Sequence, residues 1–150
     1  MMTSDYKDML SALSNADVDF VVVGAFALAA HGNPRSTGDI DIYIRPTNVN
    51  ATRLMDALKE FGTPISEIST SDFEKTDTVY HIGVAPCRIV LLTGLDGIDD
   101  FDDAWRTHIK NHVDGTFIPV LGREALIKNK RATGRPQDLA DIAWLEANPE

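Results

Sequence analysis

Two aspartates spaced two residues apart, Asp39 and Asp41, are the side chains in this sequence best suited to carry chemistry. They lie in the stretch DIDIYI, residues 39–44, whose alternation of polar and apolar residues is typical of a β-strand. Because side chains on a strand alternate between faces, Asp39, Asp41 and Tyr43 should share one face. Two carboxylates on one face of an apolar strand are costly unless a cation binds them. We expect Asp39 and Asp41 to hold Mg²⁺, which prefers carboxylate oxygens and substrate phosphates.

The residues that precede this strand predict a site for an anion. The run FVVV, residues 20–23, is apolar and β-branched and predicts a short buried strand. Gly24 ends it, and the small apolar residues from Ala25 to His31 predict a helix that begins at once. A strand, a glycine and a helix in succession point unpaired backbone N–H groups at a phosphate. Gly24 and Ala25 are therefore candidate nucleotide contacts, although Gly24 taken alone is better explained as a simple strand-to-helix turn.

A short polar segment connects this helix to the acidic strand. Asn33-Pro34 forces a turn, and Arg35, Ser36 and Thr37 follow it. These three side chains are candidate phosphate contacts, with hydrogen bonding within the loop as the alternative. His31 is interpreted as a helix-end residue that bonds to the backbone rather than as a general base.

Charge is distributed unevenly along the chain. The formal net charge is −9 and the isoelectric point is about 4.8, which argues against broad binding to nucleic acid. Residues 122–136 nevertheless hold five basic side chains and one acidic one. A local basic patch suits a triphosphate or the end of an RNA, and we select Lys130 and Arg135 as candidate nucleotide contacts. The alternative is that they form ion pairs with Asp138 or Asp141 on the last predicted helix.

These motifs, taken in order, resemble the nucleotidyltransferase superfamily, whose fold is that of DNA polymerase β. The resemblance rests on Gly24 after a strand, a short helix, His31-Gly32, an arginine and a Ser/Thr, and then Asp-x-Asp. It also rests on the C-terminal stretch 122–141, and it covers the chain from about Val18 to Leu145. The most similar group is that of the small bacterial minimal nucleotidyltransferases, which includes toxin–antitoxin members related to the AbiEii toxins.

The resemblance implies a fold, an activity and a set of ligands. The expected fold is α/β (α+β), with a small mixed sheet flanked by helices and further helices at the C-terminus. The expected activity is Mg²⁺-dependent transfer of a nucleoside monophosphate group from a nucleoside triphosphate to an acceptor. That acceptor would be a small molecule, a protein or a tRNA end. The resemblance also raises a protein partner in a toxin–antitoxin pair.

One departure from the family pattern concerns catalysis. Catalytic members of the superfamily use a third carboxylate, commonly in a pattern Arg-Ile-Asp on a later strand. The matching segment here is Arg88-Ile89-Val90, so that Val90 stands where the carboxylate is expected. A valine neither ligates a metal nor accepts a proton. Asp96 is a candidate substitute whose position the sequence leaves open.

Three functions therefore remain open at the level of sequence. The first is an active nucleotidyltransferase, which the phosphate cradle and the aspartate pair favour. The second is a nucleotide-binding protein with weakened catalysis, which Val90 favours. The third is a regulatory module, such as one half of a toxin–antitoxin pair, in which the acidic surface meets a basic partner.

The length and composition of the chain limit the kinds of structure that can position these residues. A chain of 150 residues fits a single domain over residues 1–150. The sequence has no apolar run near the ~20 residues that span a bilayer, no secretory signal and a single cysteine, so we expect a cytoplasmic protein without a disulfide or a membrane contact. The five aspartates between residues 96 and 103 are interpreted as capping a helix that begins at Asp99 or Asp100 and carries Ile109, rather than as a second metal site.

We expect further helices over 4–16, 25–31, 51–61, 123–133 and from 136 onward, and strands over 20–23, 39–44, 78–84, 88–92 and 116–120.

Overall fold

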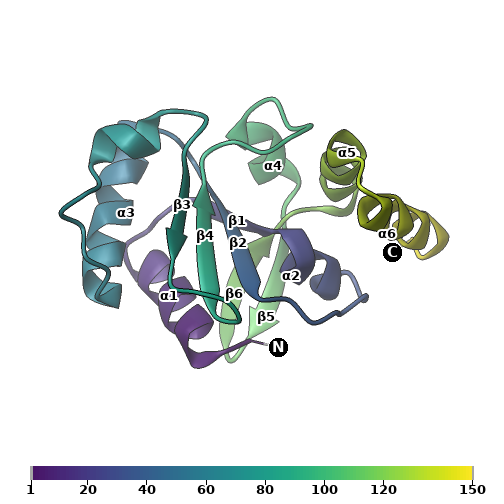
Figure 1. Cartoon of the computed structure of the whole chain (residues 1–150), viewed down its shortest axis with the longest axis horizontal. Helices are drawn as coiled ribbons and strands as arrows, with labels where there is room; N and C mark the ends of the chain where they lie inside the picture. Colours follow the sequence, from purple (N-terminus) through teal and green to yellow (C-terminus); the bar gives the residue numbers. More distant parts are fainter. Residues whose placement is uncertain (1, 150) are drawn as a thin grey trace.

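The five expected strands and one further strand over residues 109–113 assemble into a six-stranded mixed sheet within residues 2–149, the part of the chain that the computed structural model describes (Figure 1). The strands are β1 (Phe20–Val23), β2 (Asp39–Ile44), β3 (Val79–Ile82), β4 (Arg88–Leu92), β5 (Ile109–Val113) and β6 (Thr116–Val120). The helices are α1 (Ser4–Asn15), α2 (Gly24–Ala30), α3 (Asn48–Phe61), α4 (Phe101–Thr107), α5 (Arg123–Thr133) and α6 (Pro136–Ala147), with a 3₁₀ turn η1 (Thr70–Glu74) after α3.

The order of the strands places the acidic strand in the middle of the sheet. The order is β3-β4-β2-β1-β6-β5. The central strand β2 runs antiparallel to β1 and parallel to β4, and β1 runs parallel to β6. Two antiparallel hairpins, β3–β4 and β5–β6, complete the two edges. The prediction of a small mixed sheet flanked by helices is confirmed.

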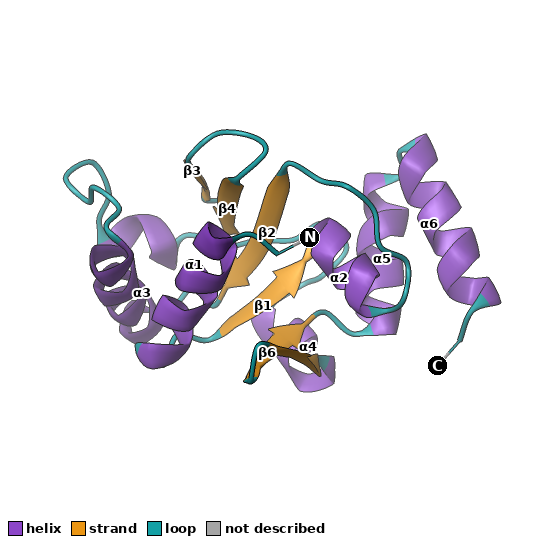
Figure 2. Ribbon diagram, turned by 90° about the horizontal axis from the view of Figure 1, so that it is seen from below, coloured by secondary structure: helices purple, strands orange, loops and turns teal. Residues whose placement is uncertain are grey.

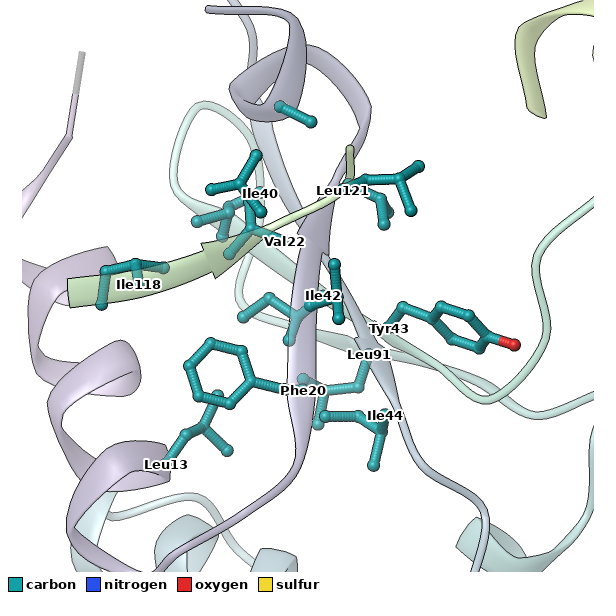
Figure 3. Packing of buried hydrophobic residues seen from close by; sticks show 14 of the residues in the cluster. Leu13, Phe20, Val22, Ile40, Ile42, Tyr43, Ile44, Leu91, Ile118 and Leu121 are labelled. Carbon is teal, nitrogen blue, oxygen red and sulfur yellow. The ribbon is translucent and has the colours of Figure 1, made fainter. Parts of the chain in front are cut away.

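One part of the hydrophobic core lies on the face of the sheet opposite the aspartates. Isoleucines of β2 point into this core with Phe20 of β1 and with Leu13 of α1, and α1 packs against α3 (Figure 3). Tyr43 points the other way, and its ring lies 5.0 Å from that of Phe101 in α4. In Figure 2, α1 and α3 lie together at one end of the molecule and α5 and α6 at the other. The aspartate face therefore opens toward the C-terminal helices.

The structure corrects the sequence reading in the segment that follows α4. The helix that we expected to carry Ile109 ends at Thr107, and Ile109 instead begins β5, where it pairs with Val120. Asp114 and Gly115, which both have positive φ, close the β5–β6 hairpin. Asp100 caps α4 by accepting a hydrogen bond from the backbone N–H of Asp103 at 3.0 Å, as predicted.

Smaller differences concern the ends of elements. Helix α1 ends at Asn15, one residue earlier than expected, and α2 begins at Gly24 itself. None of the helices formed by residues 2–149 is long and apolar enough to cross a membrane.

Candidate functional site

The two aspartates project from the middle of the sheet onto one face, as their spacing predicts. In the register of the sheet, Asp39 lies beside Arg88 and Asp41 beside Val90, both on β4. On its other side Asp41 lies beside Val23, the last residue of β1. The site therefore forms where the end of β1, the start of β2 and the start of β4 meet.

Asp39 is held by a bidentate ion pair with Arg88. The guanidinium donates from Nε to Oδ1 at 2.7 Å and from Nη2 to Oδ2 at 3.1 Å. These hydrogen bonds lower the pKa of Asp39 below its usual range and raise that of Arg88. Both side chains are about one third exposed, at 31% and 37%, so the pair lies at the rim of the site rather than beneath it.

Asp41 is more buried than Asp39 and has no such partner. Among residues 2–149, no side chain donates a hydrogen bond to its carboxylate or forms an ion pair with it. Burial raises the pKa of Asp41, and the nearby charge of Asp39 raises it further. An anionic Asp41 is therefore undercompensated by the protein.

Gly24 brings the backbone against this carboxylate. It has a positive φ of 69°, and a Cβ placed there would lie 2.3 Å from Oδ2 of Asp41. Only glycine accommodates both the conformation and the close approach. The residue before it, Val23, supplies no side-chain cap to α2, whose first turn contains the half-buried Ala25. Gly24 is thus required by the geometry of the site and is more than a turn.

The donor set fits one divalent cation. Two carboxylates lie on one face, one of them has no ion-pair partner among residues 2–149, and the Asp39 oxygens that accept from Arg88 keep further lone pairs. Hard oxygen ligands of this kind are those that Mg²⁺ prefers. With Val90 in the third position, the described residues form no group of three or more His, Cys, Asp or Glu side chains arranged around a metal.

A cavity of about 330 Å³ joins the aspartate strand to the C-terminal helices. Asp41 of β2 and Gly24 at the start of α2 line it on one side, and Lys130 of α5 and Arg135 at the start of α6 line it on the other. Residues about 90 positions apart in the sequence are thereby brought to one site. Asp96, on the loop after β4, also lies in its wall.

Lys130 is a buried ion-pair partner as well as a residue of the cavity wall. Its Nζ lies 2.8 Å from Oδ2 of Asp141 and 3.8 Å from Oδ1 of Asp138. Arg35, from the loop before β2, pairs with the same Asp141. The alternative interpretation of Lys130, pairing with the last helix, is confirmed, and this network holds α5, α6 and the loop together.

The guanidinium group of Arg135 forms an ion pair with Asp138 and is also exposed to solvent. It donates from Nε and Nη2 to the two oxygens of Asp138 at 2.8 and 3.1 Å, and these bonds lower the pKa of Asp138. Its side chain is nevertheless 69% exposed, and its charge slightly offsets the rise in the pKa of Asp41. Arg135 is the basic side chain of the cavity that is best placed to meet a ligand.

In the loop before β2, Arg35 and Thr37 bond to other residues of the protein and do not line the cavity. Thr37 accepts a hydrogen bond from the backbone N–H of Asp39 at 3.3 Å, which confirms the loop-bonding alternative for this residue. Ser36 is exposed, and Arg35 is turned toward Asp141. His31 lies at the end of α2 with its Nε2 2.9 Å from the carbonyl oxygen of Leu121, as its interpretation as a backbone-bonded residue requires.

A second cavity adjoins the first and was not foreseen from the sequence. It measures about 480 Å³, and Tyr43 and Phe101 form its aromatic part. Burial, with the charges of Asp100 and Asp103, raises the pKa of Tyr43 to about 12. Four aspartates line this cavity: Asp77, Asp96, Asp99 and Asp100. Both cavities share the walls formed by Val79, Gly94, Leu95 and Asp96. The acidic run between residues 96 and 103 is the feature of the sequence that could have indicated this cavity.

Comparison with known families decides the assignment. The sequence profile that describes aminoglycoside-2''-adenylyltransferases matches residues 6–145, nearly the whole chain. The chain belongs to the aminoglycoside-2''-adenylyltransferase family. Membership of this adenylyltransferase family confirms the superfamily to which the Asp-x-Asp motif pointed. No curated protein sequence matches the chain.

Solved structures show that the fold of this adenylyltransferase-family chain is that of nucleotidyltransferases. One is a protein from Thermotoga maritima that has been provisionally assigned as a nucleotidyltransferase, with a TM-score of 0.64 and 20% identity over 98% of this chain and 96% of the other. Another is an antigenic nucleotidyltransferase-like protein from Paracoccidioides brasiliensis, with a TM-score of 0.54 and 19% identity over 94% of this chain and 74% of the other. The narrower resemblance to the AbiEii-related group stays a prediction.

Proposed function

We propose that the protein binds a Mg²⁺–nucleoside triphosphate in the cavity beside Asp41 and transfers the nucleoside monophosphate group to an acceptor hydroxyl. One observation carries this proposal: the undercompensated carboxylate of Asp41 faces a cavity that Gly24 and Arg135 also line. When bound, Mg²⁺ neutralises charge on the phosphates and on the leaving pyrophosphate.

Different residues of the cavity would bind the metal ion and the triphosphate. Asp39 and Asp41 supply the oxygen ligands of the metal ion. Arg88 either keeps its hydrogen bonds to Asp39 while Asp39 binds the metal ion, or turns away from Asp39 toward solvent. Gly24 lets phosphate oxygens approach the backbone. Arg135 supplies a positive charge from the opposite wall, and Lys130 keeps that wall in place through Asp141.

The second cavity is proposed as the acceptor site. Its lining combines four aspartates with two aromatic rings, and the described residues that line it include no lysine, arginine or histidine. Such a surface favours an acceptor that carries several positive charges and presents hydroxyl groups. An aminoglycoside has this chemistry, and it is the compound class in the name of the family. We therefore propose an aminoglycoside-like acceptor in place of a protein or a tRNA end.

A second candidate function is nucleotide binding without transfer. It is favoured by the position of Val90, which lies beside Asp41 where a third carboxylate would complete the site. Under this alternative the protein binds Mg²⁺–nucleotide and acts through a partner. The role in a toxin–antitoxin pair stays a prediction.

Two measurements on the same protein separate these functions. Purified protein is incubated with Mg²⁺, α-³²P-labelled ATP, GTP, CTP or UTP, and kanamycin, and the labelled kanamycin is resolved by chromatography. Binding of each nucleotide is followed in parallel by calorimetry. We expect Mg²⁺-dependent binding and transfer in the wild type, and loss of both in Asp41→Asn.

Each alternative gives a different result. Binding without transfer to kanamycin, tRNA or any component of a cell extract would support the second candidate. Transfer to tRNA or to a protein, with none to kanamycin, would contradict the proposed acceptor and leave nucleotidyl transfer intact. Absence of both binding and transfer would contradict the proposed function as a whole. Arg131→Met, on the outer surface of α5, is the control that should behave as the wild type.

A further inference from the structure

A histidine lies in the same row of the sheet as Asp41 and Val90. On the edge strand β3, His81 lies directly beside Val90, and Val90 lies directly beside Asp41 on β2. Residues directly opposite each other in a sheet point to the same face. The row across the three strands therefore carries a histidine, a valine and an aspartate on the side of the nucleotide cavity.

The neighbours of His81 on β3 agree with this placement. Tyr80 packs against the buried ring of Phe73 on the core side of the sheet. His81 therefore faces the opposite side, as does Val79, two residues away, which lines both cavities. The side chain of His81 is exposed.

The spacing leaves room for a substrate group between the two polar side chains. Neighbouring strands lie about 4.8 Å apart, so the backbones of His81 and Asp41 are separated by about 10 Å across β4. Only the short apolar side chain of Val90 stands in the row between them. A hydroxyl group that enters over Val90 from the acceptor cavity would thus have Asp41 on one side and His81 on the other.

We propose that His81 accepts the proton of the acceptor hydroxyl, in place of the carboxylate that Val90 replaces. This inference rests on the proposed function. The acceptor O–H bond breaks and its proton passes to the unprotonated ring nitrogen of His81. The acceptor oxygen forms a bond to the α-phosphorus, and the bond from that phosphorus to pyrophosphate breaks, with the electron pair leaving on pyrophosphate. A neutral imidazole has the free lone pair that this transfer needs, and histidine is the commonest general base in enzymes.

The test compares His81→Ala with a matched histidine at the other edge of the sheet. His112 on β5 is also exposed and packs beside Phe117, so His112→Ala controls for loss of a surface imidazole. Transfer from α-³²P-labelled ATP to kanamycin is measured for both variants and for Asp96→Asn. Binding of Mg²⁺–ATP and the melting temperature are measured on the same preparations.

We expect His81→Ala to lower kcat at least about 100-fold, the usual contribution of a general base, with the Kd for Mg²⁺–ATP within twofold of the wild type. Added free imidazole should restore part of the activity of His81→Ala. Adding the Val90→Asp substitution to the His81→Ala variant should also restore activity. His112→Ala should match the wild type.

Distinct results overturn the inference and the function on which it rests. If the wild type and His81→Ala transfer the label equally well, the proposed role of His81 is wrong and the proposed transfer function stands. The same holds if His81→Ala is slow and imidazole does not restore it, or if Asp96→Asn shows the large loss instead. A wild type that transfers nothing overturns the proposed transfer as well.

Discussion

Val90 lies directly beside Asp41 on the neighbouring parallel strand, with its side chain on the same face of the sheet and 6% exposed. The register therefore places residue 90 next to the carboxylate that would hold the metal. A site with two carboxylates and a valine in this position can bind one cation through Asp39 and Asp41 but lacks a carboxylate base.

Replacing Val90 by aspartate should raise transfer activity. A carboxylate at this position would add a metal ligand and a proton acceptor beside Asp41. We expect kcat for transfer from ATP to rise at least about tenfold, together with a loss of unfolding free energy of about 2 kcal/mol without metal, because a charge is added to a buried position. Transfer kinetics and urea denaturation measure the two effects. Val90→Asn, which has the same size without the charge, should not raise kcat; equal gains in both variants would refute this reasoning.

Replacing Asp41 by asparagine should stabilise the metal-free protein while abolishing Mg²⁺–nucleotide binding. Burial raises the pKa of Asp41, so the folded state holds this proton more tightly than the unfolded state. Ionisation of Asp41 therefore removes stability as the pH rises from the usual pKa of an aspartate to the raised pKa of the folded state, and the loss is complete above that raised pKa. We expect Asp41→Asn to gain about 1 kcal/mol in unfolding free energy at pH 7, a size common when a functional site is relieved of strain.

The pH dependence of stability supplies the check on this prediction. Denaturation measured from pH 4 to pH 7 should show the stability of the wild type falling relative to that of Asp41→Asn. A variant that is less stable than the wild type at pH 7 would show that Asp41 is better compensated than its surroundings indicate.

Replacing Gly24 by alanine should damage the site as well as the backbone. Gly24 and Gly62 both have positive φ, at 69° and 98°, so alanine costs each of them about 1 kcal/mol or more. A Cβ at residue 24 would in addition lie 2.3 Å from Oδ2 of Asp41, whereas a Cβ at residue 62 meets nothing within 4 Å. We expect both variants to lose stability and only Gly24→Ala to lose Mg²⁺–nucleotide binding in calorimetry. Equal binding by the two variants would argue against a nucleotide site beside Gly24.

Replacing Lys130 by methionine should cost far more stability than replacing its neighbour. Lys130 is buried and holds Asp141, so its removal leaves buried carboxylates undercompensated, and breaking such a pair typically costs 3–5 kcal/mol. Arg131 is 61% exposed and lies 3.9 Å from Glu146, a surface pair whose loss should cost less than about 1 kcal/mol. Guanidinium denaturation of both variants measures the difference. Similar losses would mean that the network at Lys130 does not hold α5 to α6.

The sequence predicted the central part of the fold and of the site because the relevant signals are local. The spacing of Asp39 and Asp41 determines their shared face, and Gly24 stands where a strand passes directly into a helix. The pairing of Asp39 with Arg88 could not be predicted in this way, because it depends on the parallel register of β2 and β4, which are 49 residues apart at that point.

The features that the sequence did not reveal depend on contacts between distant segments. Ile109 follows α4 at a helical spacing, but pairing with Val120 draws it into a strand. The acidic residues near Asp99 were interpreted through local capping, which is correct for Asp100, yet the cavity they line exists only because β2 and β3 lie nearby. His81 had no local signal at all, since its neighbours become visible only when the edge strand is in register.

A crystal structure of the protein with Mn²⁺ in place of Mg²⁺ and a non-hydrolysable ATP analogue tests the central claim most directly. The account predicts an anomalous scattering peak between the carboxylates of Asp39 and Asp41, with triphosphate oxygens on the same ion and the nucleotide in the cavity lined by Arg135. A structure in which the analogue binds elsewhere, or in which no ion lies between the two aspartates while Arg88 keeps both oxygens of Asp39, would contradict it.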